Sequence, residues 1–467
     1  MSVYLSAGTG TVVHRICDEL RTQIEGRSLS AGTRMPSVRQ LAREREISTF
    51  TAAEVYNVLV AAGVLEARRG LGYFVPNRRA IRSHRPFLPE FAADALWEHR
   101  RGAHGHIEVD AGCGWLPADW LSGESIHQAM RAVARRSQPR PSGYGDPYGS
   151  AELRAYLATQ LQRRGIGATE DQIVLTHGAS QALDLIVRHC LAPGDQVVVE
   201  DPGYPPLFEL LRARGVTQLS VPRIEDGPDL NALERLLNSK RPRLLFTNTT
   251  CQNPTGTTTH AHVVQQIVHL ASKFGCGIVE DDIFAELVSR TELSLASLDQ
   301  LQHVCYVSSF SKTISPDMRV GYLAASKAMA ERLARGKATC SLATSDLMER
   351  LTLSILMHPH HRRDLERLRR RLDSAQTTVQ QSLEAQGVQL AYKPRSGMFL
   401  WGKLPSQASV AKIWQLALEH EVLLAPGELF RPTGEATPYW RFNVAHCDTA
   451  KLYEFLQLCQ RSGGMSG

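Results

Sequence analysis

The chain has 467 residues, 43% hydrophobic and 21% charged, which is typical of a globular protein too long for one hydrophobic core. No apolar run approaches the roughly eighteen residues of a membrane span, and the N-terminus lacks the basic flank and apolar core of a signal peptide. Residues 1–85 contain 13 Arg, no Lys and seven acidic residues, so they account for the entire net charge of +6. This asymmetry predicts that the N-terminal part binds a polyanion.

The cysteines and histidines do not predict a metal site. The nine cysteines are scattered, without a CxxC pair or a close Cys/His group, which favours free thiols in a reducing cytoplasm. The run Met357-His358-Pro359-His360-His361 is followed directly by two arginines and has no acidic residue nearby. We therefore expect no bound metal.

The first 75 residues are predicted to form three helices and two strands. Apolar residues recur at helical spacing over 12–24, Ser37 has the position of an N-cap for a short second helix, and 47–49 leads into a third helix ended by Gly63. Strands are predicted at 64–67 and 73–75, joined by a glycine-rich tip with two arginines. Three helices and a basic two-stranded wing form a winged helix-turn-helix, an α+β fold whose third helix enters the major groove.

Three stretches of this region resemble the GntR family of bacterial regulators: Arg34-Met35-Pro36-Ser37-Val38-Arg39-Gln40-Leu41-Ala42, Ala62-Gly63-Val64-Leu65-Glu66 and Arg69-Gly70-Leu71-Gly72-Tyr73-Phe74-Val75. The resemblance implies that residues 1–76 bind double-stranded promoter or operator DNA. The positions that it places at the DNA are Arg34, Ser37, Arg39, Ser48, Thr49, Thr51, Arg68 and Arg69.

The resemblance is incomplete, because Thr49 and Ala53 stand where some relatives carry arginines. We therefore expect more from Arg39 and the wing than from base contacts by these two residues. The alternative is a winged helix that contacts protein instead of DNA.

Residues 77–106 are predicted to be a linker. The stretch 77–86 is polar and basic, prolines stand at 86 and 89, and a short helix is expected near 91–97. Its positive charge suits non-specific attraction to DNA.

From residue 107 onward, apolar strands alternate with amphipathic helices. Strands are predicted at 172–176, 196–200, 218–221, 243–247, 277–280 and 304–307, and helices at 180–190, 206–214, 230–237 and 260–274. This alternation implies an α/β domain with a mainly parallel sheet covered by helices on both faces. Ligands bind such folds at the carboxyl ends of the strands.

Several predicted strand ends carry groups suited to an aromatic phosphate. The turn 176–181 opens a helix whose N–H groups can hold phosphate. Tyr204 follows the next strand and can lie flat on an aromatic ligand, and Asn253 can donate to a ring oxygen. The run Val279-Glu280-Asp281-Asp282 ends another strand, and we expect its carboxylates to point at the same place.

A lysine and two arginines complete this set. Lys312 lies on a tight loop after the strand at 304–307, where partial desolvation would lower its pKa and favour imine formation. Ser309 and Arg319 suit a phosphate beside it, and Arg441 in the strand-like run 439–444 suits a carboxylate. Taken alone, a lysine near an arginine is more often a solvated surface pair.

The order and spacing of these motifs over residues 107–460 resemble the fold-type I aminotransferases, which use pyridoxal 5'-phosphate (PLP). The resemblance implies that residues 107–467 form a PLP-binding domain with a small C-terminal α+β subdomain at about 340–467. It makes Lys312 the catalytic residue that forms the Schiff base. It assigns further cofactor contacts to Tyr144, Ala179, Ser180, Tyr204, Asn253, Asp281, Ser309 and Arg319.

The resemblance also specifies roles. Asp281 would keep the pyridine nitrogen protonated, and Arg441 would bind the carboxylate of an amino-acid substrate or effector. Tyr144 would reach the phosphate of a neighbouring subunit, which implies a homodimer. Phe284 stands where related enzymes commonly have a tyrosine that bonds the ring oxygen. This predicts preserved cofactor binding with poorer turnover; the alternative is neutral drift in a working enzyme.

A GntR-type winged helix followed by an aminotransferase-like domain resembles the MocR subfamily of bacterial transcription regulators. This implies a cytoplasmic regulator that binds PLP and senses an amine, an amino acid or vitamin B6. One alternative is an active PLP-dependent aminotransferase with an accessory N-terminal domain. Another is a plain repressor whose large domain only dimerises.

Overall fold

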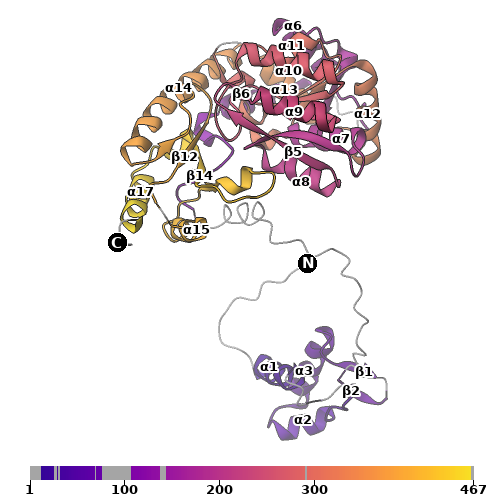
Figure 1. Ribbon diagram of the computed structural model, residues 1–467. Helices are drawn as coiled ribbons and strands as arrows, with labels where there is room; N and C mark the ends of the chain where they lie inside the picture. Colours follow the sequence, from indigo (N-terminus) through magenta and orange to yellow (C-terminus); the bar gives the residue numbers. More distant parts are fainter. Residues whose placement is uncertain are drawn as a thin grey trace. The chain divides into compact units, whose positions relative to one another are not determined.

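The computed structural model describes residues 12–25, 29, 32–68, 70–75, 107–121, 123–136, 143–289, 292–406 and 408–463. The chain divides into two compact units, residues 1–92 and 93–467 (Figure 1). The linker predicted at 77–106, together with the helix expected at 91–97, lies outside the described residues. No helix in the described ranges combines the length and apolarity needed to cross a membrane.

The N-terminal unit contains the predicted three helices and two-stranded wing. Its elements are α1 (Val12–Glu25), α2 (Val38–Glu44), α3 (Thr49–Ala61), β1 (Glu66–Arg68) and β2 (Gly72–Phe74), with the two strands antiparallel. Ser37 caps α2 by accepting a hydrogen bond from the Gln40 N–H at 3.2 Å, as predicted. The bounds of the wing strands differ from the predicted ones by one or two residues, which is normal for such short elements.

Tyr56 ties the N-terminal unit together. Its side chain is fully buried and stacks on Tyr73 of the wing, with ring centroids 4.4 Å apart. Its hydroxyl donates to the Pro36 carbonyl at 2.7 Å, in the turn before α2. One side chain of α3 thus fixes both the wing and the α2 turn, because its buried hydroxyl has found a partner.

The second unit is built on an eight-stranded sheet with the order β3-β10-β9-β8-β7-β4-β5-β6. Its strands are β3 (Ile173–Thr176), β4 (Gln196–Asp201), β5 (Thr217–Ile224), β6 (Gly227–Pro228), β7 (Leu244–Thr247), β8 (Gly277–Asp281), β9 (Val304–Ser309) and β10 (Gly321–Ala324). The neighbours from β9 to β5 are parallel, whereas β10 runs antiparallel to β3 and β9. The prediction of a mainly parallel sheet is confirmed; β10 was missed because its four residues follow the lysine loop directly.

Helices cover both faces of this sheet, as predicted (Figure 1). They are α5 (Gly123–Arg136), α6 (Ala151–Arg163), α7 (Gly178–Cys190), α8 (Pro205–Ala213), α9 (Leu230–Lys240), α10 (Ala261–Phe274), α11 (Leu295–Asp299), α12 (Lys327–Ser341) and α13 (Asp346–Leu356). Successive residues of β4 reach different cores: Val198 packs in one cluster, and Val197 and Val199 pack in another. A strand buried on both sides explains the unbroken apolar run in the sequence.

A second, antiparallel sheet forms the C-terminal part, with the order β11-β12-β14-β13. Its strands are β11 (Gln389–Leu390), β12 (Phe399–Lys403), β13 (Ala425–Pro426) and β14 (Tyr439–Asn443), and its helices are α14 (His361–Ala385), α15 (Val410–Glu419), α16 (Val444–Cys447) and α17 (Ala450–Gly463). Val109 bridges Val422, so the first described stretch of this unit lies against this sheet. Short 3-10 turns occur at η1 (Ala118–Trp120), η2 (Glu170–Gln172), η3 (Ala285–Leu287), η4 (Phe310–Lys312), η5 (Pro316–Met318) and η6 (Gly427–Phe430).

Candidate functional site

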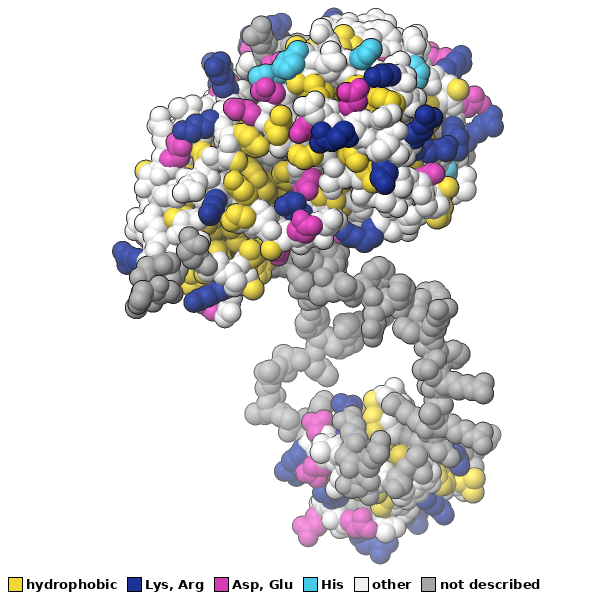
Figure 2. All heavy atoms as spheres, viewed as in Figure 1, with side chains coloured by type: hydrophobic (Ala, Val, Ile, Leu, Met, Phe, Trp, Pro, Cys, Tyr) yellow, Lys and Arg dark blue, Asp and Glu magenta, His cyan; other side chains and the backbone are white. Residues whose placement is uncertain are grey.

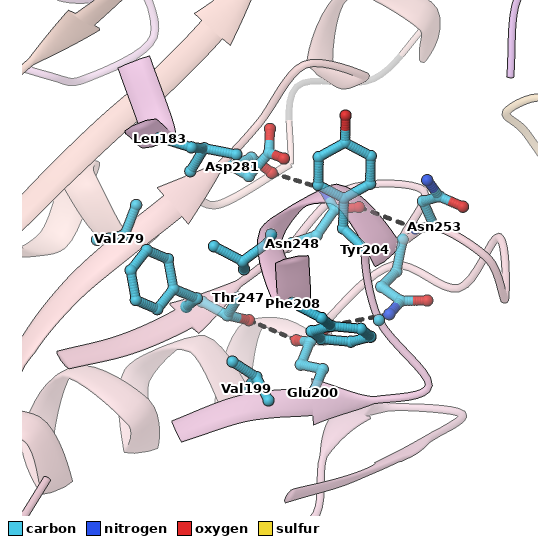
Figure 3. Close-up of a pocket in the computed structure, with 14 residues that line it drawn as sticks. Leu183, Val199, Glu200, Tyr204, Phe208, Thr247, Asn248, Asn253, Val279 and Asp281 are labelled. Atoms are coloured by element: carbon cyan, nitrogen blue, oxygen red, sulfur yellow. Dashed lines mark hydrogen bonds between the residues drawn. The ribbon is translucent and has the colours of Figure 1, made fainter. Parts of the chain in front are cut away.

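A pocket lies where β4, β7 and β8 end, as expected for an α/β sheet. Figure 3 shows Asp281, Tyr204 and Asn253 along one edge of it, with Phe208 on the opposite side. Asn248 fixes this edge, because its amide nitrogen donates to the Asp281 carbonyl at 2.5 Å and its Oδ1 accepts from the Asn253 N–H at 2.9 Å. The structure therefore brings together residues from three strand ends that the sequence predicted to meet.

Lys312 ends η4, which follows β9 directly. Its Nζ donates a hydrogen bond to the Gly114 carbonyl at 2.6 Å. Burial is the main cause that lowers the pKa of Lys312 to about 8, and the nearby Arg441 guanidinium is the second cause. A substantial fraction of this amine is therefore neutral near physiological pH, which a nucleophilic lysine requires.

Asp281 ends β8 and faces the same pocket. Its Oδ1 is buried and has no hydrogen-bond partner among the described residues. Burial raises the pKa of this carboxyl to about 7. A buried acceptor without a donor is unfavourable, so the site fits a ligand that brings a cationic N–H to this oxygen.

The neighbouring carboxylates do not point into the pocket, so the expectation for 279–282 is wrong in part. Glu280 accepts from the Leu295 and Ala296 N–H groups at 3.0 and 2.9 Å, where it caps α11. Asp282 accepts from Arg164 at 2.7 Å. Successive side chains alternate across a strand, so only the middle carboxylate of the three faces the ligand side.

Arg441, in β14, contacts the pocket residue Asn253. Its Nη1 donates to Asn253 Oδ1 at 2.8 Å and its Nη2 to the Gly112 carbonyl at 2.6 Å, while its buried Nε has no partner among the described residues. The guanidinium lies over Phe399 and Phe430, 4.5 and 4.8 Å from the ring centroids. Burial lowers the pKa of Arg441 to about 10. Asn253 Oδ1 accepts from Arg441, so the NH2 group of Asn253 is the part that can donate to a ligand.

The helix α7 begins at Gly178 directly after β3 and beside Arg319. Gly178 has φ +74°, and a Cβ there would lie 2.9 Å from the Arg319 guanidinium. Arg319 Nη2 donates to the His177 carbonyl at 3.0 Å. Glycine thus allows the cation to approach the positive end of a helix, an arrangement that suits a bound anion.

The remaining predicted cofactor contacts lie around this helix start or on the surface. Ser309 is buried at the end of β9, and its Oγ accepts from the Ser311 N–H at 3.2 Å. Ala179 and Ser180 are in the first turn of α7, half-buried and exposed respectively. Tyr144 is 85% exposed, so within one chain it takes no part in the pocket.

Phe284 does not line the pocket. It is 2% exposed and meets Phe399 edge to face, with ring centroids 5.6 Å apart. Its ring packs as expected, and Phe399 in turn supports Arg441. The residue therefore acts on the site through packing.

Sequence reasoning missed a buried polar network in the wall of the pocket. Arg223 Nη1 lies 3.0 Å from Glu200 Oε1, and the two side chains are 0% and 3% exposed. Glu200 also accepts from Gln252 Nε2 at 3.0 Å and from Thr247 Oγ1 at 2.5 Å. The network fixes the turns that carry Tyr204 and Asn253. Its residues are far apart in the sequence, and only the position of Glu200 at a strand end signalled it.

In the N-terminal unit the predicted DNA-contacting arginines lie on the surface. Arg34 and Arg39 are exposed. Arg68 is also exposed; it lies over Phe74, 4.7 Å from the ring centroid, and pairs with Glu66 at 3.4 Å. Arg69 lies outside the described residues. Figure 2 shows arginine side chains distributed around this unit, which contains no lysine.

The predicted contacts at the start of α3 share one cap. Ser48 Oγ accepts from the Thr51 N–H at 3.0 Å and lies 2.8 Å from Thr51 Oγ1. Thr49 is exposed beside them. The cap holds the first turn of α3 rigid.

Metal-binding side chains do not cluster in the described ranges. Within them, no three His, Cys, Asp or Glu side chains are grouped to hold a metal ion.

Comparisons with known proteins agree with both parts. The model of "Aminotransferase class I and II" matches residues 116–458, and that of "Bacterial regulatory proteins, gntR family" matches 13–75. The HTH-type transcriptional regulator YdcR of Escherichia coli is 28% identical and covers 92% of this chain and 94% of its own. The 2-aminoadipate transaminase of Thermus thermophilus is 32% identical over 73% of this chain and 86% of its own. The solved α-aminoadipate aminotransferase LysN, also from Thermus thermophilus, gives a TM-score of 0.71 at 29% identity, over 79% of this chain and 94% of that chain.

Proposed function

The chain belongs to the aminotransferase class I and II family and carries a GntR-family domain, and on this premise we propose how its two parts work together. It is a PLP-binding transcription regulator of the MocR type, with a DNA-binding N-terminal unit. The large unit senses an amino compound, or PLP itself, and thereby changes how the protein binds promoter DNA. A protein that binds a bacterial promoter works in the cytoplasm.

The observation that carries this proposal is the unpaired, buried carboxylate oxygen of Asp281 in a pocket beside a lysine of lowered pKa. Asp281 would hold a proton on the pyridine nitrogen, and Tyr204 would lie against the ring. Gly178, Ser309 and Arg319 would hold the phosphate at the start of α7, together with Ala179 and Ser180. When bound, the cofactor supplies an aldehyde that reacts with amines and a ring that withdraws electrons.

The chain's own residues then determine what is sensed. The Lys312 amine would hold the cofactor through its aldehyde carbon, and an effector amine would compete with Lys312 for that position. Arg441 binds the effector carboxylate, and Phe399 and Phe430 exclude water from that ion pair.

Two carbonyls offer a route from the ligand to the rest of the chain. Lys312 and Arg441 hold the carbonyls of Gly114 and Gly112, each at 2.6 Å. These glycines belong to 107–121, the first described stretch after the segment that leads from the N-terminal unit. A ligand that engages both cations removes them from these carbonyls. Regulation requires that the freed stretch favour a second arrangement with a different ligand affinity.

The regulator works as a homodimer in this proposal. Tyr144, Met130 and Leu347 are 85%, 54% and 60% exposed on the large unit, and a second copy would cover such side chains. Tyr144 would then reach the phosphate held by the neighbouring subunit, so each site would need both copies.

The test uses the purified full-length protein and a duplex of its own promoter region. Incubation with PLP turns the protein yellow, and borohydride fixes the cofactor to Lys312. Promoter affinity or footprint then differs between cofactor-free, cofactor-loaded and amino-acid-treated protein. A protein that stays colourless contradicts cofactor binding, and identical affinity and footprint in all three states contradict sensing.

A second candidate is an active aminotransferase. The 32% identity with a 2-aminoadipate transaminase favours it, and so does the buried Lys312 amine of lowered pKa near Asp281 and Arg441. Turnover of amino donors at rates typical of enzymes, with no salt-sensitive DNA binding, would support this function over regulation.

A further inference from the structure

The helix α3 has no basic residue. Its sequence TFTAAEVYNVLVA contains a single charged side chain, Glu54. The DNA-binding arginines described above lie elsewhere in the unit. A helix that enters the major groove without a cation cannot use the common bidentate contact from arginine or lysine to guanine.

One large apolar side chain of this helix is strongly exposed. Phe50, in the first turn, is 78% exposed. The buried face of α3 is complete without it, because Ala52, Val55, Tyr56 and Leu59 are 0% exposed. Phe50 therefore contributes little to the core, and its apolar ring is exposed to solvent.

The position of Phe50 is fixed. The Ser48 cap makes two hydrogen bonds to Thr51, at 3.0 and 2.8 Å, on either side of Phe50 in the sequence. Ala53, partly exposed, follows three residues later on a neighbouring part of the helix surface. The N-terminal part of α3 thus presents a phenyl ring and a methyl group on a rigid backbone.

Only one base offers an apolar group in the major groove, because thymine carries a 5-methyl group there. We propose that Phe50 contacts the 5-methyl group of thymine, so that α3 selects its operator by van der Waals contact. Phosphate binding is left to Arg34, Arg39 and Arg68. This inference rests on the proposed entry of α3 into the major groove.

The test begins with in vitro selection of duplexes from a random pool by the full-length protein. In the selected duplex, each thymine is replaced in turn by deoxyuridine, which keeps the base pair and removes only the methyl group. At one or two positions per half-site we expect about fourfold weaker binding in an anisotropy titration, the value for burying one methyl group.

The decisive measurement is a double-mutant cycle. Phe50→Ala should bind the thymine duplex more weakly and lose the discrimination between thymine and uracil at those positions. The matched control is Val58→Ala, which removes another exposed apolar side chain of α3, 41% exposed and two turns away, and should keep the discrimination. Circular dichroism checks that both variants are folded.

Three outcomes separate the possibilities. Discrimination that disappears only in Phe50→Ala supports the contact. Selected duplexes that bind equally with thymine and uracil at every position, or a Phe50→Ala variant with unchanged discrimination, overturn this inference and leave the proposed function intact. A failure to select any duplex contradicts DNA binding itself, and with it both proposals.

Discussion

The substitution Asp281→Asn should have opposite effects on stability and on cofactor binding. Asparagine keeps the shape of the side chain and removes its charge. Without cofactor, the charged carboxylate is a burden, because its Oδ1 is buried and unpartnered and its pKa is raised to about 7. In the proposed complex with PLP, the same charge would face the pyridine nitrogen and become favourable.

The stability effect follows from the pKa. A rise from 3.8 to about 7 penalises ionisation in the folded state by on the order of 4 kcal/mol, an upper estimate. The pKa of Asp281 is higher in the folded than in the unfolded state. The contribution of its protonated carboxyl to folding stability is therefore fully present below about pH 4. It is lost as the pH rises through about 7. Asp281→Asn should therefore stabilise the cofactor-free protein at pH 8 and have little effect at the acidic end of this range.

The binding effect has the opposite sign. Losing a charge-assisted hydrogen bond costs about 1.5–3 kcal/mol, which corresponds to about 10- to 150-fold weaker PLP binding. Urea unfolding at pH 4 and pH 8 measures the first effect, and an absorbance titration with PLP measures the second. A variant that is less stable than the wild type at pH 8 without cofactor, or that binds PLP equally well, would refute the reasoning.

Asp282→Asn is the matched control for this experiment. It removes the charge of the neighbouring carboxylate. The Asp282 side chain is 0% exposed, and its carboxylate pairs with Arg164 at 2.7 Å. Breaking a buried ion pair leaves an uncompensated charge, so this variant should lose about 3 kcal/mol of stability while PLP binding changes little.

Four further predictions follow from the same structure. Lys312→Ala should abolish borohydride-fixed PLP by mass spectrometry, whereas wild-type attachment should speed up as the pH rises through about 8, where the amine loses its proton; retained labelling would contradict the assignment. Arg39→Ala should weaken binding to all duplexes alike and reduce the slope of log affinity against log salt by about one, and a change confined to one sequence would indicate base readout instead. Arg223→Met should lower the urea-unfolding free energy by about 3–5 kcal/mol because Glu200 is left buried and unpaired; a neutral result would mean that water reaches this carboxylate. Phe284→Tyr should leave single-turnover transamination unchanged, because Phe284 is buried against Phe399 and does not line the pocket; a faster rate would show that the added hydroxyl reaches the cofactor.

Local patterns in the sequence predicted much of this structure. The capped start of α2, the alternation of strands and helices, and the placement of Lys312 and Asp281 at strand ends all depend on short stretches with a clear physical signal. The carboxyl ends of parallel strands share one sheet edge, so residues from several of them could be predicted to meet without knowing their contacts.

The contacts that the sequence did not predict join distant segments. Lys312 and Gly114 are 198 positions apart, and Arg441 and Gly112 are 329 apart. Nothing local to Gly112 or Gly114 signals that a cation will bind its carbonyl, although two glycines so close together are typical of a close backbone approach. The direction of the three carboxylates was mispredicted for a different reason: the alternation of side chains along a strand was not applied to the last residues of β8.

The arrangement of β8 limits how this protein can evolve. Glu280 caps a helix, Asp281 faces the pocket and Asp282 pairs with an arginine, so three consecutive acids have three separate tasks. Point substitutions would damage these tasks one at a time. An insertion or deletion of a single codon upstream in the strand would instead turn every following side chain to the opposite face, and one event would remove the helix cap, the pocket acid and the ion pair together. Length variation among descendants of this chain should therefore accumulate in its loops and be absent from this strand.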